Sequence, residues 1–110
     1  MNKYGARKTI IDGVTFDSKR EAARYQELKL LRCAGEIIDF TLQPKFELLA
    51  GFEKKGKKYK PVTYKADFIV TYPDGRREVE DVKGVLTRDF QIRRKMFEIQ
   101  YPDLTLVIIW

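Results

Sequence analysis

Apolar and polar residues in this 110-residue chain follow helical spacing in two segments. Residues 18–34 open with Ser18 and Glu21, spaced as in a capping box, and Gly35 follows as a C-terminal stop. Residues 87–100 repeat apolar positions in the same way. The sequence therefore predicts two helices. Their apolar sides are expected to carry Ala22, Tyr25, Leu28, Leu31 and Cys33 in the first, and Phe90, Met96, Phe97 and Ile99 in the second.

The segments before and after the first predicted helix have strand-like patterns. Residues 10–16 predict a short hairpin, because Asp12-Gly13 is a turn pair between apolar residues. Residues 36–53 alternate as strands do, with an interruption at Pro44, and lead to a basic tip at residues 54–58. We expect that tip to close a second hairpin.

Three further strands complete the predicted order. Residues 62–72 and 76–83 are joined by Pro73-Asp74-Gly75, and residues 104–110 form a nearly all-apolar run. Such a run suits a strand buried on both faces, and therefore a central or parallel one. We predict one α/β domain over residues 1–110, with a flexible start at 1–8. Its order is helix, three antiparallel strands, helix and strand.

Acidic and basic residues fall together on two of these strands. Asp81 and Lys83 share one face, because side chains alternate along a strand. Whether Asp67 joins them depends on the turn between the strands. A two-residue turn would set Asp67 opposite Val82, on the wrong face.

The turn residues favour a three-residue loop. In Pro73-Asp74-Gly75, proline suits the first turn position and glycine the left-handed third position. That loop pairs Tyr72 with Arg76 and sets Asp67 opposite Asp81. The sequence thus predicts two neighbouring carboxylates with an ammonium beside them. Such a pair needs a proton or a cation to offset its repulsion.

The composition of the chain excludes several kinds of catalytic and metal-binding site. The chain has no histidine and a single cysteine, Cys33, which excludes histidine-based catalysis, an internal disulfide and cysteine-rich zinc sites. Carboxylates alone favour hard cations such as Mg²⁺ or Mn²⁺. The 22 basic residues against 16 acidic ones indicate a polyanionic partner, although an ordinary basic surface is the alternative.

Four sequence motifs together carry a resemblance to a known family. They are Phe16-x-Ser18-x-x-Glu21, Leu42-Gln43-Pro44, Asp67 and Asp81-Val82-Lys83. These motifs resemble the PD-(D/E)XK nuclease superfamily, whose core has the same αβββαβ order, and more narrowly its small phage and prophage members of the Holliday-junction-resolvase kind. Two departures are Ala66, where the superfamily usually has proline, and Asp81, where glutamate is commoner.

The resemblance implies a restriction-endonuclease-like domain with a mixed sheet flanked by helices. It implies Mg²⁺ or Mn²⁺ held by Asp67, Asp81, the Val82 carbonyl and Glu21, with Lys83 as the catalytic lysine. For Glu21 the alternative is helix capping alone, since one rotamer is not expected to fill both roles. Gln43 either reaches the site or, with Pro44, only interrupts the sheet.

Several side chains are candidates for nucleic-acid contact, and about half of such charges are expected to be plain surface. Arg94 or Lys95 could steady the scissile phosphate. Tyr59 and Tyr64 could stack on bases, with packing favoured for Tyr64, and Trp110 is expected in the core or a dimer interface. The basic candidates are Arg88, Arg93, Arg94, Lys95, Lys55, Lys57 and Lys58.

The sequence-based hypothesis is a metal-dependent endonuclease that hydrolyses DNA, selective for branched DNA and working as a homodimer. A non-catalytic DNA-binding accessory protein is the alternative, and a structural phage component is a third. The N-terminal ten residues lack the apolar run of a signal peptide, and no stretch is long and apolar enough to span a bilayer. We therefore expect the cytoplasm of a bacterial host and no membrane partner.

Overall fold

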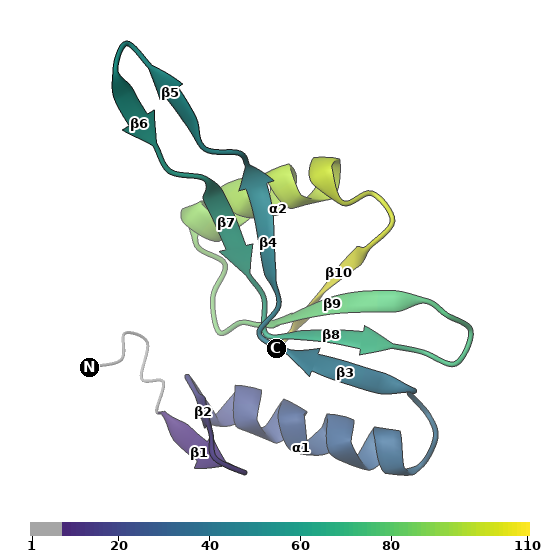
Figure 1. Cartoon of the computed structure of the whole chain (residues 1–110). Helices are drawn as coiled ribbons and strands as arrows, with labels where there is room; N and C mark the ends of the chain where they lie inside the picture. Colours follow the sequence, from purple (N-terminus) through teal and green to yellow (C-terminus); the bar gives the residue numbers. More distant parts are fainter. Residues whose placement is uncertain (1–7) are drawn as a thin grey trace.

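A computed structural model describes residues 8–110 as a mixed α/β structure with two helices and ten short strands (Figure 1). The predicted flexible segment 1–8 lies, except for Lys8, outside the described residues. The helices are α1 (Lys19–Cys33) and α2 (Arg88–Gln100). The strands are β1 (Thr9–Ile11), β2 (Val14–Phe16), β3 (Asp39–Leu42), β4 (Lys45–Leu49), β5 (Phe52–Lys54), β6 (Lys57–Tyr59), β7 (Val62–Lys65), β8 (Phe68–Thr71), β9 (Arg77–Val82) and β10 (Thr105–Ile109).

Both helix predictions are confirmed, and each helix begins at a hydroxyl cap. The Ser18 Oγ accepts a hydrogen bond from the Glu21 N–H at 3.1 Å, and Thr87 caps α2 in the same way. Two residues predicted to lie on the buried sides of these helices are exposed instead. Cys33 is exposed, and Ile99 is 80% exposed because it falls on the side of α2 that faces away from the sheet.

The first hairpin is also confirmed. Strands β1 and β2 pair antiparallel, with Ile11 opposite Val14. Asp12 and Gly13 between them both have left-handed backbone, at φ 53° and 76°. This is the conformation that a two-residue hairpin turn requires, and Asp-Gly adopts it readily.

A four-stranded sheet in the order β10-β9-β8-β3 forms the centre, with α1 and α2 on opposite faces (Figure 1). Strand β8 is antiparallel to β3 and β9, whereas β10 is parallel to β9. Along the chain, the elements around this sheet follow the order α1, β3, β8, β9, α2, β10. The predicted order of helix, three strands, helix and strand is therefore found only among the elements that form or cover this sheet, because β4–β7 intervene between β3 and β8 along the chain.

The last strand is parallel, as expected, but it is not central. Strand β10 lies at the edge of the sheet, and within it only Leu106 is buried. Trp110 is 62% exposed, which excludes the core as its place and leaves the dimer interface, the other expected place, as a prediction. An apolar run shows that a strand is at least partly covered, but it does not show on how many sides.

The predicted strand 62–72 is in fact two strands, β7 and β8, that join different sheets. Strand β7 pairs with β4, while β8 pairs with β3 and β9. The opposing chain breaks at the same level, where Gln43 adopts a φ of 50°. There the Gln43 N–H donates to the Asp67 carbonyl at 2.8 Å, and the Ala66 N–H donates to the Pro44 carbonyl at 3.0 Å. The β4–β7 ribbon therefore branches off the central sheet.

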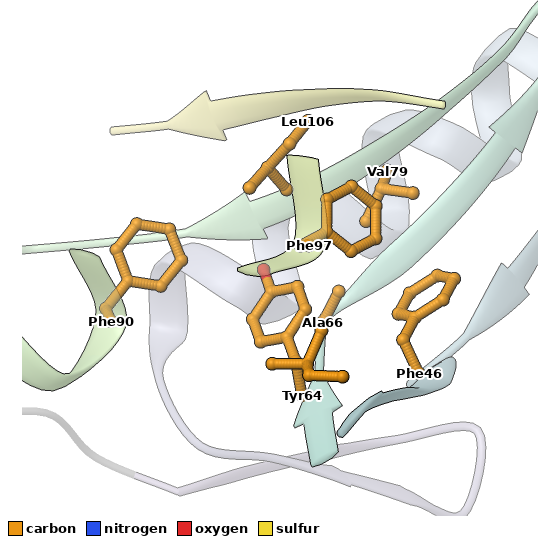
Figure 2. Close-up of a cluster of buried hydrophobic side chains, with 8 residues drawn as sticks. Phe46, Tyr64, Ala66, Val79, Phe90, Phe97 and Leu106 are labelled. Atoms are coloured by element: carbon orange, nitrogen blue, oxygen red, sulfur yellow. The ribbon is translucent and has the colours of Figure 1, made fainter. Parts of the chain in front are cut away.

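The core consists of two apolar clusters, one on each face of the sheet. The cluster beneath α2 joins that helix to the β4–β7 ribbon, and Figure 2 shows Phe46, Tyr64 and Phe97 gathered there. The other cluster joins α1 and the first hairpin to Phe68 and Val70 of β8. In the described part of the chain, neither helix is long and apolar enough to cross a membrane.

Candidate functional site

The β8–β9 hairpin has the predicted three-residue turn. Gly75 has a φ of 90°, and the Tyr72 N–H donates to the Arg76 carbonyl at 2.9 Å. The register then pairs Phe68 with Glu80, so the next position sets Asp67 beside Asp81. Because the turn fixes the register, it also decides that these two carboxylates lie together.

Asp67 and Asp81 line a cleft of about 790 Å³ together with Glu21 and Lys83. These four side chains come from the junction of β7 and β8, from β9, from the first turn of α1 and from the residue after β9. The structure thus brings all four predicted catalytic residues to one concave surface. The remaining lining residues are Asp17, Ser18, Lys19, Arg20, Lys65, Val82, Gly84, Val85, Thr87 and Trp110.

Asp81 is buried and held by two neighbours. Its Oδ2 accepts a short hydrogen bond from the Tyr64 hydroxyl, and its Oδ1 lies 3.3 Å from the Lys83 Nζ. Burial and the charge of Asp81 raise the pKa of Tyr64, so the phenol stays a proton donor. The Lys83 ammonium also lies over the Phe90 ring, 4.2 Å from its centroid. Asp81 and Lys83 are therefore fixed against the apolar cluster beneath α2.

Asp67 and Glu21 form an acid pair that retains a proton. Burial and the neighbouring Glu21 carboxylate raise the pKa of Asp67 to about 8, and the two side chains hydrogen-bond to each other. The Val82 N–H, which donates to Asp67 Oδ2 at 2.6 Å, opposes this rise. The pKa of Glu21 is also raised, by burial and then by the charge of Asp17. Near neutral pH this pair holds less negative charge than two free carboxylates.

The donor set fits a hard divalent cation in its chemistry. Four carboxylates, those of Asp17, Glu21, Asp67 and Asp81, line the cleft, and a cation among them would offset their mutual repulsion. In residues 8–110, however, no three acidic side chains are close enough together to enclose a cation as they stand. The contacts with Tyr64 and Lys83 engage both carboxylate oxygens of Asp81.

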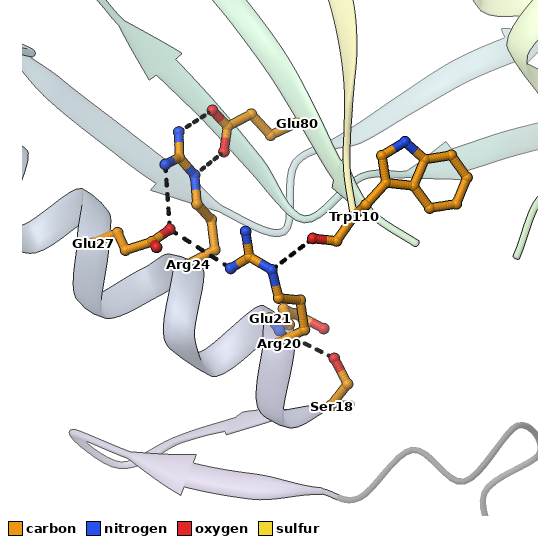
Figure 3. A network of polar contacts seen from close by, with 7 residues as sticks. All are labelled: Ser18, Arg20, Glu21, Arg24, Glu27, Glu80 and Trp110. Carbon is orange, nitrogen blue, oxygen red and sulfur yellow. Dashed lines mark hydrogen bonds and ion pairs between the residues drawn. The ribbon is translucent and has the colours of Figure 1, made fainter. Parts of the chain in front are cut away.

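A buried ion pair attaches α1 to the strand that carries Asp81 (Figure 3). The Arg24 guanidinium binds both carboxylate oxygens of Glu80, at 2.7 and 2.6 Å, and Glu80 is 1% exposed. One turn earlier in α1, the Arg20 Nε donates to the Trp110 backbone carbonyl at 2.8 Å. These contacts fix the end of α1 that carries Glu21 against β9 and the residue after β10.

The predicted basic residues on α2 do not line the cleft. Arg94 and Lys95 border a separate depression and do not line the cleft, so their contact with a scissile phosphate stays a prediction. Arg93 is engaged internally, since it pairs with Asp89 and donates to the Thr63 carbonyl. Arg88 is exposed at the start of α2, and Lys55, Lys57 and Lys58 are exposed on the β5–β6 hairpin. The Gln43 side chain is not among the lining residues, and its break in the sheet is the alternative that the structure supports.

Sequence reasoning missed three residues that shape the site and the role of a fourth. Lys65 and Arg20 line the cleft, Arg24 pairs with Glu80, and Tyr64, expected to pack or to stack on bases, also donates to Asp81. Simple spacing could have pointed to two of them. Lys65 precedes Asp67 by two positions, and Arg24 lies one helical turn after Glu21.

The fold and the cleft define a mixed α/β protein with an acidic site bordered by lysine and arginine. Residues 1–110 match the family described as a protein of unknown function, DUF1064, and the chain belongs to that family. No curated protein and no solved structure matches the chain.

Proposed function

We propose that this protein is a metal-dependent endonuclease that hydrolyses phosphodiester bonds in DNA. The observation that carries the proposal is the meeting of Glu21, Asp67, Asp81 and Lys83 in one cleft. Acidic residues on their own would repel a polyanion, but Lys19, Arg20 and Lys65 border the same cleft. A site that combines carboxylates with a basic border suits phosphate chemistry.

The element order supports the same proposal. When β4–β7 and the first hairpin are set aside, the central sheet with α1 and α2 follows the αβββαβ order that the resemblance to the PD-(D/E)XK superfamily implies. Asp67 lies where β7 and β8 part, and Asp81 and Lys83 lie at the end of β9. The superfamily assignment and the resolvase-like preference for branched DNA are parts of the proposal.

Each side chain has a role that follows from its surroundings. Asp67, Asp81 and Glu21, with the Val82 carbonyl, would hold Mg²⁺ or Mn²⁺. When bound, the cation would orient the phosphate, lower the pKa of a water and offset the charge of the transition state. Lys83 lies near enough to Asp81 to orient the attacking water or neutralise a phosphate oxygen. The Tyr64 hydroxyl restrains Asp81 from the apolar side.

Cleavage assays test the proposal directly. Purified protein is incubated with duplex, single-stranded, flap and four-way-junction DNA, in Mg²⁺, Mn²⁺ or EDTA. We expect metal-dependent cutting that falls by roughly a hundredfold or more in Asp81→Asn and Lys83→Met. Glu36→Gln serves as the control, because Glu36 is exposed beyond α1 and does not line the cleft. If wild-type protein cuts no substrate with either metal, the enzyme proposal is refuted.

One observation favours the alternative of a non-catalytic DNA-binding protein. Among the acidic residues that the structure describes, no three are arranged closely enough to enclose a cation. Metal-independent DNA binding without cleavage, in the wild type as well as in Asp81→Asn, would identify that function. Assembly as a homodimer remains a prediction that light scattering can test.

A further inference from the structure

The β5–β6 hairpin projects from the rest of the molecule, and no other helix or strand in residues 8–110 packs on it (Figure 1). All residues in 49–61 are exposed. This arm, residues 52–60, holds five lysines and a single acidic residue, Glu53. Its lysines are Lys54, Lys55, Lys57, Lys58 and Lys60. So many positive charges on one exposed hairpin indicate a polyanionic partner.

The aromatic residues of the arm are engaged within it. Phe52 and Tyr59 face each other across the two strands with ring centroids 4.6 Å apart and an interplanar angle of 11°. The Lys57 Nζ lies 5.0 Å from the centre of the Tyr59 ring. Each ring therefore covers one face of the other and stiffens the hairpin, while Phe52 stays 49% and Tyr59 40% exposed.

Two more lysines lie at the end of the ribbon that is nearer the cleft. Strands β4 and β7 lead from the central sheet to the hairpin, and on them Lys45 and Lys65 stand directly opposite each other. Like charges in that position destabilise a sheet, and both side chains are exposed. Lys65 also lines the cleft. An anion that bridged the two ammonium groups would relieve their repulsion.

We infer that the arm and the β4–β7 ribbon hold double-stranded nucleic acid that extends from the cleft. Residues 45–55 along one side of the ribbon would span at most roughly 33 Å at about 3.3 Å per residue. This is close to one helical turn of DNA, about 34 Å. A two-stranded β-ribbon also fits the major groove. The inference deepens the proposed function and rests on it for the position of the scissile phosphate.

Two other partners fit less well. A single strand would need open aromatic faces, and Phe52 and Tyr59 are stacked on each other. A second copy of the chain would bring another net charge of +6 toward a lysine-rich arm. Duplex nucleic acid satisfies the charge and offers a continuous line of phosphates.

Fluorescence anisotropy of the Asp81→Asn full-length protein in EDTA isolates binding from cleavage. The probes are labelled duplexes of about 8 and about 24 base pairs, below and above one helical turn of about 10 base pairs. The single strand of the longer duplex is a third probe. Lys55→Gln/Lys58→Gln is compared with Arg32→Gln/Arg77→Gln, which removes the same charge. Arg32 in α1 and Arg77 in β9 lie near the C-terminal end of α1 and the β8–β9 turn, at the opposite end of the molecule (Figure 1).

We expect the arm variant to bind the long duplex roughly tenfold more weakly per lysine at about 0.05 M salt. The slope of log affinity against log salt should fall by about 2. The short duplex should lose much less affinity, and the control should change neither probe as strongly. Thermal unfolding should be nearly equal in all variants, because the arm lysines are exposed and the ion pair that the control removes, that of Arg32 with Asp39, is exposed too.

The inference is overturned if the arm variant binds the long duplex as well as the control variant does. It is also overturned if short and long duplexes lose affinity equally, or if the single strand binds more tightly than the duplex. These outcomes are separate from the proposed function. If duplex binding depends on the arm but the wild type cuts no substrate, only the enzyme proposal is refuted. If the wild type cuts DNA and the arm variant binds and cuts equally well, only this inference is refuted.

Discussion

Replacing Asp67 with asparagine should stabilise the metal-free protein while abolishing its activity. The side chain of Asp67 is largely buried beside Glu21 and Asp81, and its pKa is raised from 3.8 to about 8. The folded state therefore binds a proton that the unfolded state releases. The contribution of Asp67 to the free energy of unfolding is therefore constant below about pH 4, falls as the pH rises toward 8, and is constant again above that.

The magnitude follows from this pKa difference. Each pH unit between the two pKa values removes about 1.4 kcal/mol from the free energy of unfolding. The largest loss that Asp67 can cause at pH 8 is therefore about 6 kcal/mol. Asparagine keeps an acceptor for the Val82 N–H, which now bonds Asp67 at 2.6 Å, but it buries an amide beside two remaining acids. We expect Asp67→Asn to recover part of this loss, so that its free energy of unfolding at pH 8 exceeds that of the wild type by about 2 kcal/mol. For a domain of this size the melting temperature should rise by roughly 10 °C.

Thermal and urea unfolding in EDTA across about pH 5 to 9 measures this effect for wild type, Asp67→Asn and the exposed control Glu36→Gln. The wild type and the control should lose stability with rising pH, and Asp67→Asn should lose much less. Added Mg²⁺ should stabilise the wild type and narrow the gap, because a ligand that binds only the folded state raises its stability. An asparagine variant that is less stable than wild type at pH 8, with an unchanged pH slope, would refute the reasoning.

Two further predictions concern the scaffold of the site. Arg24→Met should cost about 3–5 kcal/mol in urea unfolding, because it leaves the buried Glu80 carboxylate without its partner. Arg24→Met combined with Glu80→Leu should recover most of that loss, and no recovery would contradict the ion-pair account. Gly75→Ala should cost about 1–2 kcal/mol in the same assay, since alanine is strained at a φ of 90°. Gly84→Ala is its control, with no positive φ and open space around an added Cβ, and equal losses in the two would contradict the turn argument.

Local signals in the sequence predicted much of the fold and the register of the site. The Asp12-Gly13 turn, the Ser18 cap and the Pro73-Asp74-Gly75 loop each depend on a few neighbouring residues. Turn chemistry of this kind is decided within the turn, so it is visible without knowledge of the rest of the chain. The meeting of Asp67 and Asp81 followed from the loop alone.

The features that sequence reasoning missed depend on contacts between distant segments. The break between β7 and β8 exists because Gln43 and Pro44 interrupt the opposing strand at the same level. The edge position of β10 depends on no further strand joining it, and nothing in its own residues encodes that. Lys65 reaches the cleft only because the ribbon branches there. Hydrophobic periodicity carries no information about such branching.

Glu21 shows how a capping residue can also belong to a site. The expectation was that one rotamer could serve only the cap or only the cleft. In the structure the cap is closed by Ser18, whose Oγ accepts from the Glu21 N–H. The buried Glu21 carboxylate meanwhile hydrogen-bonds both to the backbone of Asp17 and to the side chain of Asp67. The capping turn thus orients this carboxylate into the cleft, so the start of α1 and the geometry of the acidic site are set by the same few residues.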